Sequence, residues 1–363
     1  MQRGGIQNWL MHLLRAIDRQ QYRMDFLVLD NRPSDYNREF GQLGSRVMQC
    51  SAGRDPASFA RDLIRVLRTH GPYDVVHSHV YAFTGFVMWL AAWQRVPLRI
   101  AHAHTDRRVV EAKGGMMRKC RLRLMKSWIS KYAVVKIGAS NDAAEDLFGP
   151  EWKRDPTVRI LHCGIDLAPF RAVPDAGLRA SLGLPADALV IGHVGRFVAP
   201  KNHAFLVEVA AEAMRLDHRI RLLLIGDGPL RQEIESRAGA CCITERVHFA
   251  GERDDVPAIM GAAMDVFVFP SLHEGLGLVV IEAQATGLPC LIADRVPREA
   301  DVVPGLVCRL PLEQGPAAWA NHLLEVSAKP RVQRAEALAA VERSTFNITR
   351  SVRHITRIYD GDA

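Results

Sequence analysis

Short runs of Val, Ile and Leu alternate with longer amphipathic patterns along almost the whole chain. Such runs are typical of strands that are buried on both faces, and the patterns between them are typical of helices. Their alternation predicts an α/β protein with parallel, doubly wound sheets. We expect strands at residues 24–29, 75–78, 99–103 and 134–138 in the first half, and at 189–194, 220–225, 247–250, 266–270, 289–293 and 305–309 in the second.

The alternation is interrupted between residues 164 and 185, where prolines and glycines gather and no strand pattern is present. A fresh series begins after this stretch, and 363 residues are enough for two domains of ordinary size. We therefore predict two Rossmann-like domains that face a cleft, where a ligand would bind. The first would comprise residues 1–164 with a C-terminal helix at 346–360, and the second residues 165–345.

The composition is that of a globular protein with a substantial core, since 48% of the residues are hydrophobic and 24% are charged. The longest apolar run, residues 85–93, is much shorter than the roughly 20 residues of a membrane-spanning helix. The chain opens with an amphipathic pattern, which is not that of a signal peptide. The seven cysteines form no CxxC pair and no disulfide framework. We expect a cytoplasmic protein with reduced thiols.

The net charge of +7 is unevenly distributed. Residues 1–164 carry 26 Lys and Arg against 15 Asp and Glu, whereas the remaining residues carry 21 against 25. This predicts an anionic partner for the first half, and we expect no nucleic acid. Residues 107–136 hold ten basic residues and one acid, Glu111. They favour a helix at 114–132 that is either a solvated face or a contact with an anionic membrane surface.

Several common cofactor and metal motifs are absent from the sequence. The glycine pairs at 226–228 and 275–277 lack the third glycine of a dinucleotide fingerprint, and there is no P-loop. The sequence shows no HExxH motif and no clustered His and Cys ligands. Its DxD, Asp360 and Asp362, lies within the last four residues, where fraying argues against a metal role. We expect neither a cofactor nor a metal.

The segment 269–289 carries the most specific chemical pattern. A strand is expected to end at Pro270 and a helix to begin near Leu278, with glycines in the loop between them. Backbone amides and the helix dipole at such a start suit a phosphate. Glu282 lies in this helix, which is otherwise apolar on nearly every side, so its carboxylate needs a partner. That partner could be a ribose diol, an arginine or solvent.

Glu274 and Glu282 are separated by seven residues, and their context resembles the EX7E motif of family 4 retaining glycosyltransferases with the GT-B fold. The resemblance covers nearly the whole chain and is nearest to the branch that builds capsular polysaccharides and exopolysaccharides. Cys163 is a departure, because it stands where the family usually has asparagine. The other matching segments are residues 4–6, 74–79, 101–105, 163–166, 193–196, 201–203, 225–230 and 247–251.

The resemblance implies that the chain is a metal-independent, retaining hexosyltransferase. It would move a sugar from a nucleotide-sugar, with UDP as the expected nucleotide, to a glycan or lipid-linked acceptor at the inner face of the membrane. Glu274 would contact the transferred sugar and Glu282 the ribose. Arg196 and Lys201 would hold the diphosphate.

Further roles follow from the same resemblance. Residues near Glu252 and Arg253 would meet the base, and His104 of the first domain would lie near the sugar, although it could also be a packed strand-end histidine. His102 and His79 are less clear candidates, and His77 is expected to alternate into the core. The donor-binding set is completed by backbone at Gly4, Gly5, Gly275, Leu276, Gly277 and Leu278.

The pair Gly4–Gly5 sits almost at the first residue. In this family such a pair follows the first, central strand, which would need roughly ten residues before Gly4. We expect an apolar strand upstream of Met1. A chain lacking it is expected to have an unstable first domain and weak activity.

Two other functions are compatible with a GT-B fold. A nucleotide-sugar epimerase would share the fold without needing Glu274 and Glu282 at this spacing. A catalytically impaired binding subunit is disfavoured by the intact donor residues, whereas a damaged first domain would favour it. A phosphorylase is disfavoured by the short chain and by the lack of a pyridoxal-lysine motif.

Overall fold

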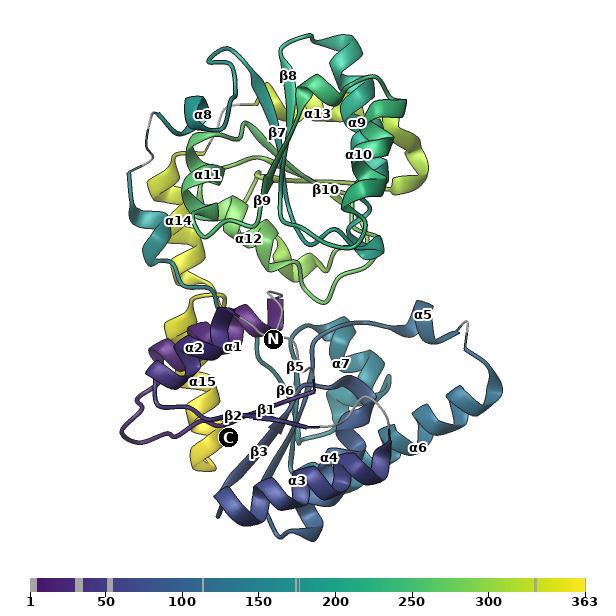
Figure 1. Ribbon diagram of the computed structural model, residues 1–363, viewed down its shortest axis with the longest axis vertical. Helices are drawn as coiled ribbons and strands as arrows, with labels where there is room; N and C mark the ends of the chain where they lie inside the picture. Colours follow the sequence, from purple (N-terminus) through teal and green to yellow (C-terminus); the bar gives the residue numbers. More distant parts are fainter. Residues whose placement is uncertain are drawn as a thin grey trace. The chain divides into compact units, whose positions relative to one another are not determined.

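The computed structural model describes residues 5–29, 35–50, 55–112, 114–173, 175, 177–329 and 332–362. The chain forms two compact units, of which the first joins residues 1–164 to residues 348–363 and the second comprises residues 165–347. Both contain parallel sheets covered by helices, which confirms the predicted α/β class (Figure 1).

The second unit is built around six parallel strands in the order β12-β11-β10-β7-β8-β9. Helices cover both faces of this sheet (Figure 1). The strands are β7 (Leu189–Val194), β8 (Ile220–Ile225), β9 (Val247–Gly251), β10 (Val266–Phe269), β11 (Cys290–Ala293) and β12 (Val307–Leu310). The helices are α8 (Leu178–Ser181), α9 (His203–Leu216), α10 (Arg231–Ala240), α11 (Val256–Ala262), α12 (Leu278–Ala285), α13 (Gly315–Ser327) and α14 (Arg334–Arg343).

The strand order places a topological switch point between β7 and β10. From β7 the chain winds outwards to β9, and from β10 it winds outwards in the opposite direction to β12. In an open parallel sheet the loops after two such strands diverge and leave a crevice at the carboxyl edge. Ligand-binding residues of this unit are therefore expected after β7 and β10.

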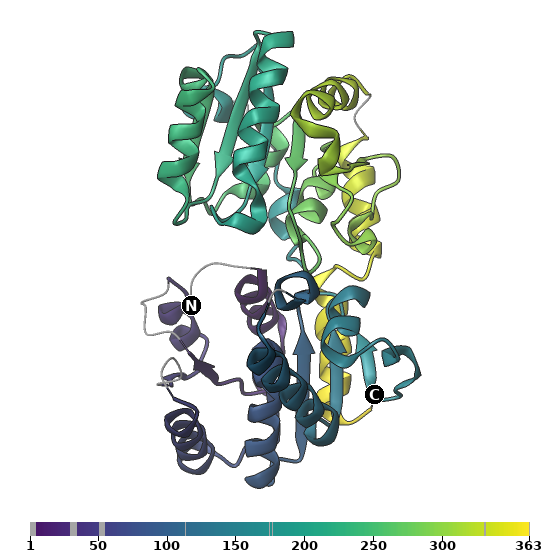
Figure 2. The ribbon, with the colours of Figure 1, turned by 90° about the vertical axis from the view of Figure 1, so that its right-hand side faces the viewer.

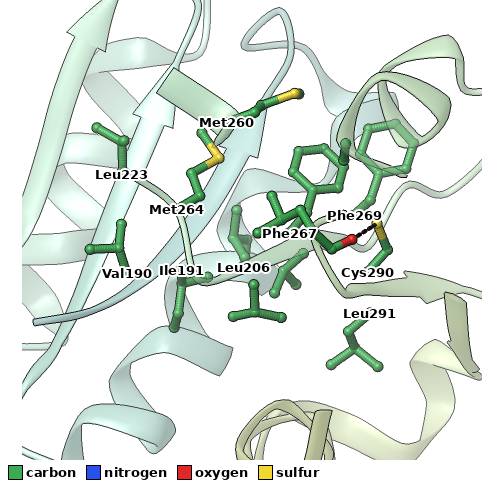
Figure 3. Close-up of a cluster of buried hydrophobic side chains, with 14 of the residues drawn as sticks. Val190, Ile191, Leu206, Leu223, Met260, Met264, Phe267, Phe269, Cys290 and Leu291 are labelled. Carbon is green, nitrogen blue, oxygen red and sulfur yellow. Dashed lines mark hydrogen bonds between the residues drawn. The ribbon is translucent and has the colours of Figure 1, made fainter. Parts of the chain in front are cut away.

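The core of the second unit explains its apolar strands. Most side chains of β7 and β8 and all of those of β10 are buried, and they interdigitate with side chains of the neighbouring helices (Figure 3). Gly192 within β7 is required by this packing, because a Cβ there would lie 2.0 Å from the sulfur of Met264. Coverage on both faces is the reason that these strands are continuous apolar runs.

The first unit contains two sheets among its described residues, and both are parallel. One pairs β1 (Phe26–Val28) with β2 (Val47–Gln49). The other has the order β3-β4-β5-β6, with β3 (Val75–Ser78), β4 (Leu98–Ala103), β5 (Val135–Gly138) and β6 (Val158–Ile160). The helices are α1 (Gly5–Ala16), α2 (Asp35–Gln42), α3 (Pro56–His70), α4 (Thr84–Trp93), α5 (Arg108–Ala112), α6 (Met116–Tyr132), α7 (Asn141–Phe148) and α15 (Ile348–Asp360).

Helix α15, from the end of the chain, belongs to the first unit (Figure 2). It packs against α1, where the indole Nε1 of the fully buried Trp9 donates a hydrogen bond to Ser351 Oγ at 3.1 Å. Gly4 and the strand expected before it lie outside the described residues.

The ten predicted strands are confirmed, with ends that differ by up to two residues. Sequence analysis missed β2 and β6, which have three residues each. These runs are too short to give a periodic signal, because β2 offers one apolar β-branched residue, Val47, and β6 offers two, Val158 and Ile160. The predicted helix at 114–132 corresponds to α6. Within the described residues, no helix is long and apolar enough to cross a membrane.

Candidate functional site

The loops after β7 and β10 are tied together at the switch point. Lys201 Nζ lies 2.7 Å from Glu274 Oε1, so the two side chains form an ion pair between the loops. Asn202 Nδ2 donates to the carbonyl of Pro270 at 3.1 Å, and the amide of Leu272 donates to the carbonyl of Pro200 at 2.8 Å. These contacts hold both loops in one arrangement at the place where the sheet topology predicts a ligand.

The ammonium group of Lys201 is held between a carboxylate and an aromatic ring. Its ammonium group lies 4.8 Å from the ring centroid of Phe269, and it is half-buried. Asn202, with φ of 55°, follows it and begins α9. A cation that is fixed by a carboxylate and an aromatic ring, and still partly exposed, is suited to meet an anionic ligand.

The start of α12 has the expected glycine geometry. Gly277 precedes the helix with φ of +84°, a left-handed conformation in which a side chain would be strained. The first turn of a helix has amides without intrahelical partners, and the helix dipole adds partial positive charge there. Gly275, Leu276 and Leu278 flank this turn, so the structure places all four predicted backbone positions at the helix start.

Glu282 lies on the second turn of α12, among side chains that are almost all apolar. Burial raises the pKa of its carboxyl group to about 7. The desolvated carboxyl group gains from any donor that reaches it. The two glutamates therefore have different surroundings. Glu274 forms an ion pair with Lys201, whereas Glu282 lies on a helix whose other side chains are almost all apolar.

Arg196 lies in the loop after β7 and is exposed. The loop is pressed against the turn that follows β8, where Phe197 N donates to the carbonyl of Asp227 at 2.9 Å. Gly226 and Gly228 make this approach possible, because a Cβ on Gly226 would lie 2.2 Å from the carbonyl oxygen of Gly195. The two glycines that resembled a dinucleotide fingerprint thus support the loop that carries Arg196.

The residues proposed to meet the base lie after β9. Arg253 forms an ion pair with Asp255 at 2.7 Å, and Arg253 holds the pKa of that carboxyl group below its usual range. Glu252 is exposed. The guanidinium of Arg253 is therefore already engaged, which leaves the backbone of this segment as the available contact.

Two buried histidines, His193 and His203, lie near Lys201, and sequence analysis gave neither of them a role of its own. Nδ1 of His193 on β7 donates a hydrogen bond to the carbonyl oxygen of Val268 at 2.8 Å, and the ring of His193 lies 4.6 Å from that of His203. Burial lowers the pKa of His193 to about 4 and that of His203 to about 2. Both rings are neutral, so the positive charge of Lys201 is tolerated beside them.

In the first unit, His104 lies at the end of β4 within a group of four histidines. Its Nε2 is 2.8 Å from Nδ1 of His79, and Nε2 of His77 is 3.1 Å from Nδ1 of His102. His77 shares a face with His79 and is half-buried, and its ring stacks on the fully buried ring of His102. Burial lowers the pKa of all four rings. Gly5 begins α1, with open space around it.

The expectation that no His and Cys ligands cluster is wrong for the folded chain. His77, His79 and His102 offer ligand atoms within 4.8 Å of one another, as do His102, His104 and Cys163. Linear spacing could not reveal this, since strand pairing brings residues of β3 and β4 together and adds Cys163 from beyond β6.

The basic segment 107–136 is only partly solvated. On α6, Trp128 packs against Trp89 of α4 with ring centroids 5.2 Å apart, while Met116 and Met117 are 77% and 87% exposed. A cavity of about 460 Å³ lies within the first unit beside α6. Its lining includes Phe83, Phe86, Arg107, Arg118, Arg121 and Met125. Of the apolar side chains of α6, Trp128 is therefore packed against α4, whereas Met116 and Met117 are exposed.

Comparisons with known proteins agree with this architecture. The family model described as Glycosyl transferases group 1 matches residues 176–341, and that described as Glycosyl transferase 4-like domain matches residues 4–164. EpsF of Bacillus subtilis (strain 168), a protein named as a glycosyltransferase, is 35% identical over 366 residues. The match covers 99% of this chain and 94% of EpsF.

Two further proteins extend the comparison. The D-inositol 3-phosphate glycosyltransferase of Mycobacterium leprae is 31% identical over 308 residues, which cover 80% of this chain and 70% of that protein. The crystal structure of HepE from Anabaena in complex with UDP and glucose has a TM-score of 0.80 and 19% identity. It covers 99% of this chain and 96% of HepE, and it shows that the fold is GT-B.

Proposed function

This chain belongs to the group 1 glycosyltransferases with a family 4-like N-terminal domain, and we propose that it transfers a sugar from a nucleotide-sugar to a glycan or lipid-linked acceptor in surface polysaccharide biosynthesis. The expected nucleotide is UDP, which HepE binds. The observation that carries the proposal is the ion pair of Lys201 and Glu274 at the switch point, beside the start of α12.

The donor would bind with its diphosphate at this place. Lys201, Arg196 and the first amides of α12 supply positive charge where the leaving group develops negative charge. Glu274 would accept hydrogen bonds from the transferred sugar, held in position by Lys201. Glu282 would accept hydrogen bonds from the ribose diol.

The proposed reaction retains the configuration at the anomeric carbon. The bond between that carbon and the diphosphate oxygen breaks as the acceptor hydroxyl forms a new bond on the same face. The proton of the hydroxyl passes to an oxygen of the leaving diphosphate. The protein would therefore act by electrostatic stabilisation, and this step requires no divalent metal.

A donor panel tests the proposed activity directly. The full chain is incubated with UDP-, GDP-, ADP- and dTDP-sugars, with and without an acceptor extract, in the presence of EDTA. Nucleotide release that depends on the acceptor supports transfer. Conversion of a UDP-sugar to its epimer without an acceptor would instead identify an epimerase, and no turnover with any donor would indicate a binding subunit.

We further propose that the exposed part of α6 contacts an anionic membrane at its inner face, close to a lipid-linked acceptor. Met116 and Met117 provide apolar side chains at the beginning of the helix, and Arg121 and Arg123 provide exposed cations. Apolar insertion together with basic charge is the combination that binds anionic lipid surfaces. The adjoining 460 Å³ cavity is lined by apolar side chains, three arginines and Glu111, which is paired with Arg118, so Arg107 and Arg121 are the lining cations that could meet part of an anionic amphiphile.

The membrane contact predicts salt-sensitive binding to vesicles that contain anionic lipid. The double variant Arg121→Gln/Arg123→Gln should lower the vesicle partition coefficient by roughly thirtyfold, since each cation near such a surface contributes about 1 kcal/mol. Co-sedimentation measures it. The matched control is Lys153→Gln/Arg154→Gln, which removes two exposed cations elsewhere in the first unit. Equal losses in both variants would refute a specific role for α6.

A further inference from the structure

Five side chains that can bind a metal meet in the first unit. Residues two apart on a strand share a face, so His77 and His79 project together from β3 and the end of that strand, and His102 and His104 from β4. The strands are parallel neighbours, with His77 opposite Ile100. This register brings both histidine pairs onto one face, and Cys163 approaches His104 from beyond β6.

The hydrogen bonds among these side chains define which nitrogens are left to bind. Nδ1 of His77 is 2.9 Å from the hydroxyl of Tyr359, and Nε2 of His77 is 3.1 Å from Nδ1 of His102. A neutral imidazole has one N–H and one lone pair. If His102 donates from Nδ1, its Nε2 carries the lone pair. This atom is buried and has no hydrogen-bond partner within the described part of the chain.

The second histidine pair leaves a similar arrangement. Nε2 of His104 is 2.8 Å from Nδ1 of His79, which leaves Nδ1 of His104 facing Sγ of Cys163 at 3.8 Å. A donor bond from the far ring nitrogen to a fixed acceptor is the arrangement that orients histidines which bind metals. His77 and His79 thus orient His102 and His104 respectively.

The distances suit a tetrahedral ion after small adjustments. With metal–nitrogen distances of about 2.0–2.1 Å and a metal–sulfur distance of about 2.3 Å, tetrahedral ligand atoms lie roughly 3.3–3.6 Å apart. Ligand atoms of His102, His104 and Cys163 all lie within 4.8 Å of one another. Half-buried His79 and His104 leave the cluster accessible.

We propose that His102, His104 and Cys163 bind one Zn²⁺ ion, through Nε2, Nδ1 and Sγ, with a water or other oxygen as fourth ligand. Two imidazoles and one thiolate favour Zn²⁺ over Mg²⁺ or Ca²⁺, which prefer oxygen ligands. Binding displaces the thiol proton of Cys163 to solvent, and no electron is transferred. The site lies in the first unit and goes beyond the proposed sugar transfer, which needs no metal.

Titration of the full chain with Co²⁺, a spectroscopic substitute for Zn²⁺, tests this site without donor or acceptor. We expect one equivalent to bind, with a sulfur-to-cobalt charge-transfer band that Zn²⁺ abolishes by competition. Cys163→Ser should remove the band, and Cys120→Ser, which alters an exposed thiol of the same unit, should leave it unchanged. His77→Asn should weaken binding about 10- to 100-fold, because it removes the partner that orients His102.

Thermal unfolding of each variant without metal shows whether its fold is intact, and the isosteric Cys163→Ser change keeps the test usable if His102 variants do not fold. No Co²⁺ or Zn²⁺ binding at millimolar metal would overturn the proposal. Binding that survives in Cys163→Ser but not in His79→Asn would also overturn it, since it would place the ion in the other group of three, His77, His79 and His102.

Discussion

Lys201→Ala is expected to lower the turnover number of sugar transfer by 10²- to 10³-fold, which is the effect of removing one charge-stabilising donor from an active site. Lys201 is the one half-buried cation fixed between the two switch-point loops among the described residues. Without it, the departing diphosphate loses a positive charge and Glu274 loses the ion pair that positions it. Steady-state nucleotide release in the presence of the acceptor measures the change.

Two further variants show whether the positive charge at position 201 or the shape of the lysine side chain is needed. Lys201→Arg keeps the charge and should retain more activity than Lys201→Ala, whereas Lys329→Ala removes an exposed lysine of the same unit and should leave turnover unchanged. A partly exposed ion pair contributes only about 1 kcal/mol to stability, so the melting temperature of Lys201→Ala should fall by a few degrees at most. Turnover of Lys201→Ala within threefold of the wild type would rule out the proposed donor site.

The second unit was predictable from the sequence because its strands are buried on both faces. Residues 189–194 and 220–225 are mostly apolar, and both segments coincide with observed strands. The glycines and the helix start after residue 270 were predictable for the same reason, since apolar periodicity fixes where the strand ends and the helix begins. The ion pair of Lys201 and Glu274 was not, because the two residues are 73 positions apart and meet only through the pairing of β7 with β10.

The histidine cluster of the first unit shows where sequence reasoning stops. The patterns around His77 and His102 each show two histidines two apart, which on a strand predicts a shared face. Only the register between β3 and β4 shows that the two pairs share the same face and touch. Cys163 was noted as a departure from the family pattern, and its place beside His104 follows from a loop whose path no local pattern encodes.

Glu282→Gln is expected to lower the affinity for the nucleotide and to raise the stability of the free protein at neutral pH. Burial raises the pKa of Glu282 to about 7, from 4.5 in an unfolded chain. Ribose hydroxyls donate hydrogen bonds most strongly to the ionised carboxylate. Nucleotide binding to the wild type should therefore weaken as the pH falls from 8 to 6, by about tenfold, because the ionised fraction falls by that factor around a pKa of 7.

The stability of the free wild-type protein changes with pH in the opposite direction to its affinity for the nucleotide. Below pH 4.5 the carboxyl group is protonated in both the folded and the unfolded states, so it contributes no penalty. As the pH rises from 4.5 towards 7, the unfolded state loses its proton first, and the free energy of unfolding falls. Above pH 7 the folded state carries a desolvated charge, at a cost on the order of 3 kcal/mol. Glu282→Gln lacks this penalty and should be more stable than the wild type at pH 8.

Calorimetric titration with UDP and thermal unfolding, each at pH 6, 7 and 8, measure both effects. Glu325→Gln, an exposed glutamate of the same unit, is the control for loss of a negative charge. Protonation of UDP itself is the same in the experiments on all three proteins. The difference in affinity between the variants therefore reports the contribution of Glu282. A variant that is less stable than the wild type at pH 8, or that binds UDP with unchanged affinity and pH dependence, would remove Glu282 from the donor site. A gain in stability with a loss of binding would show that this buried carboxylate is kept for its ligand at the expense of the fold.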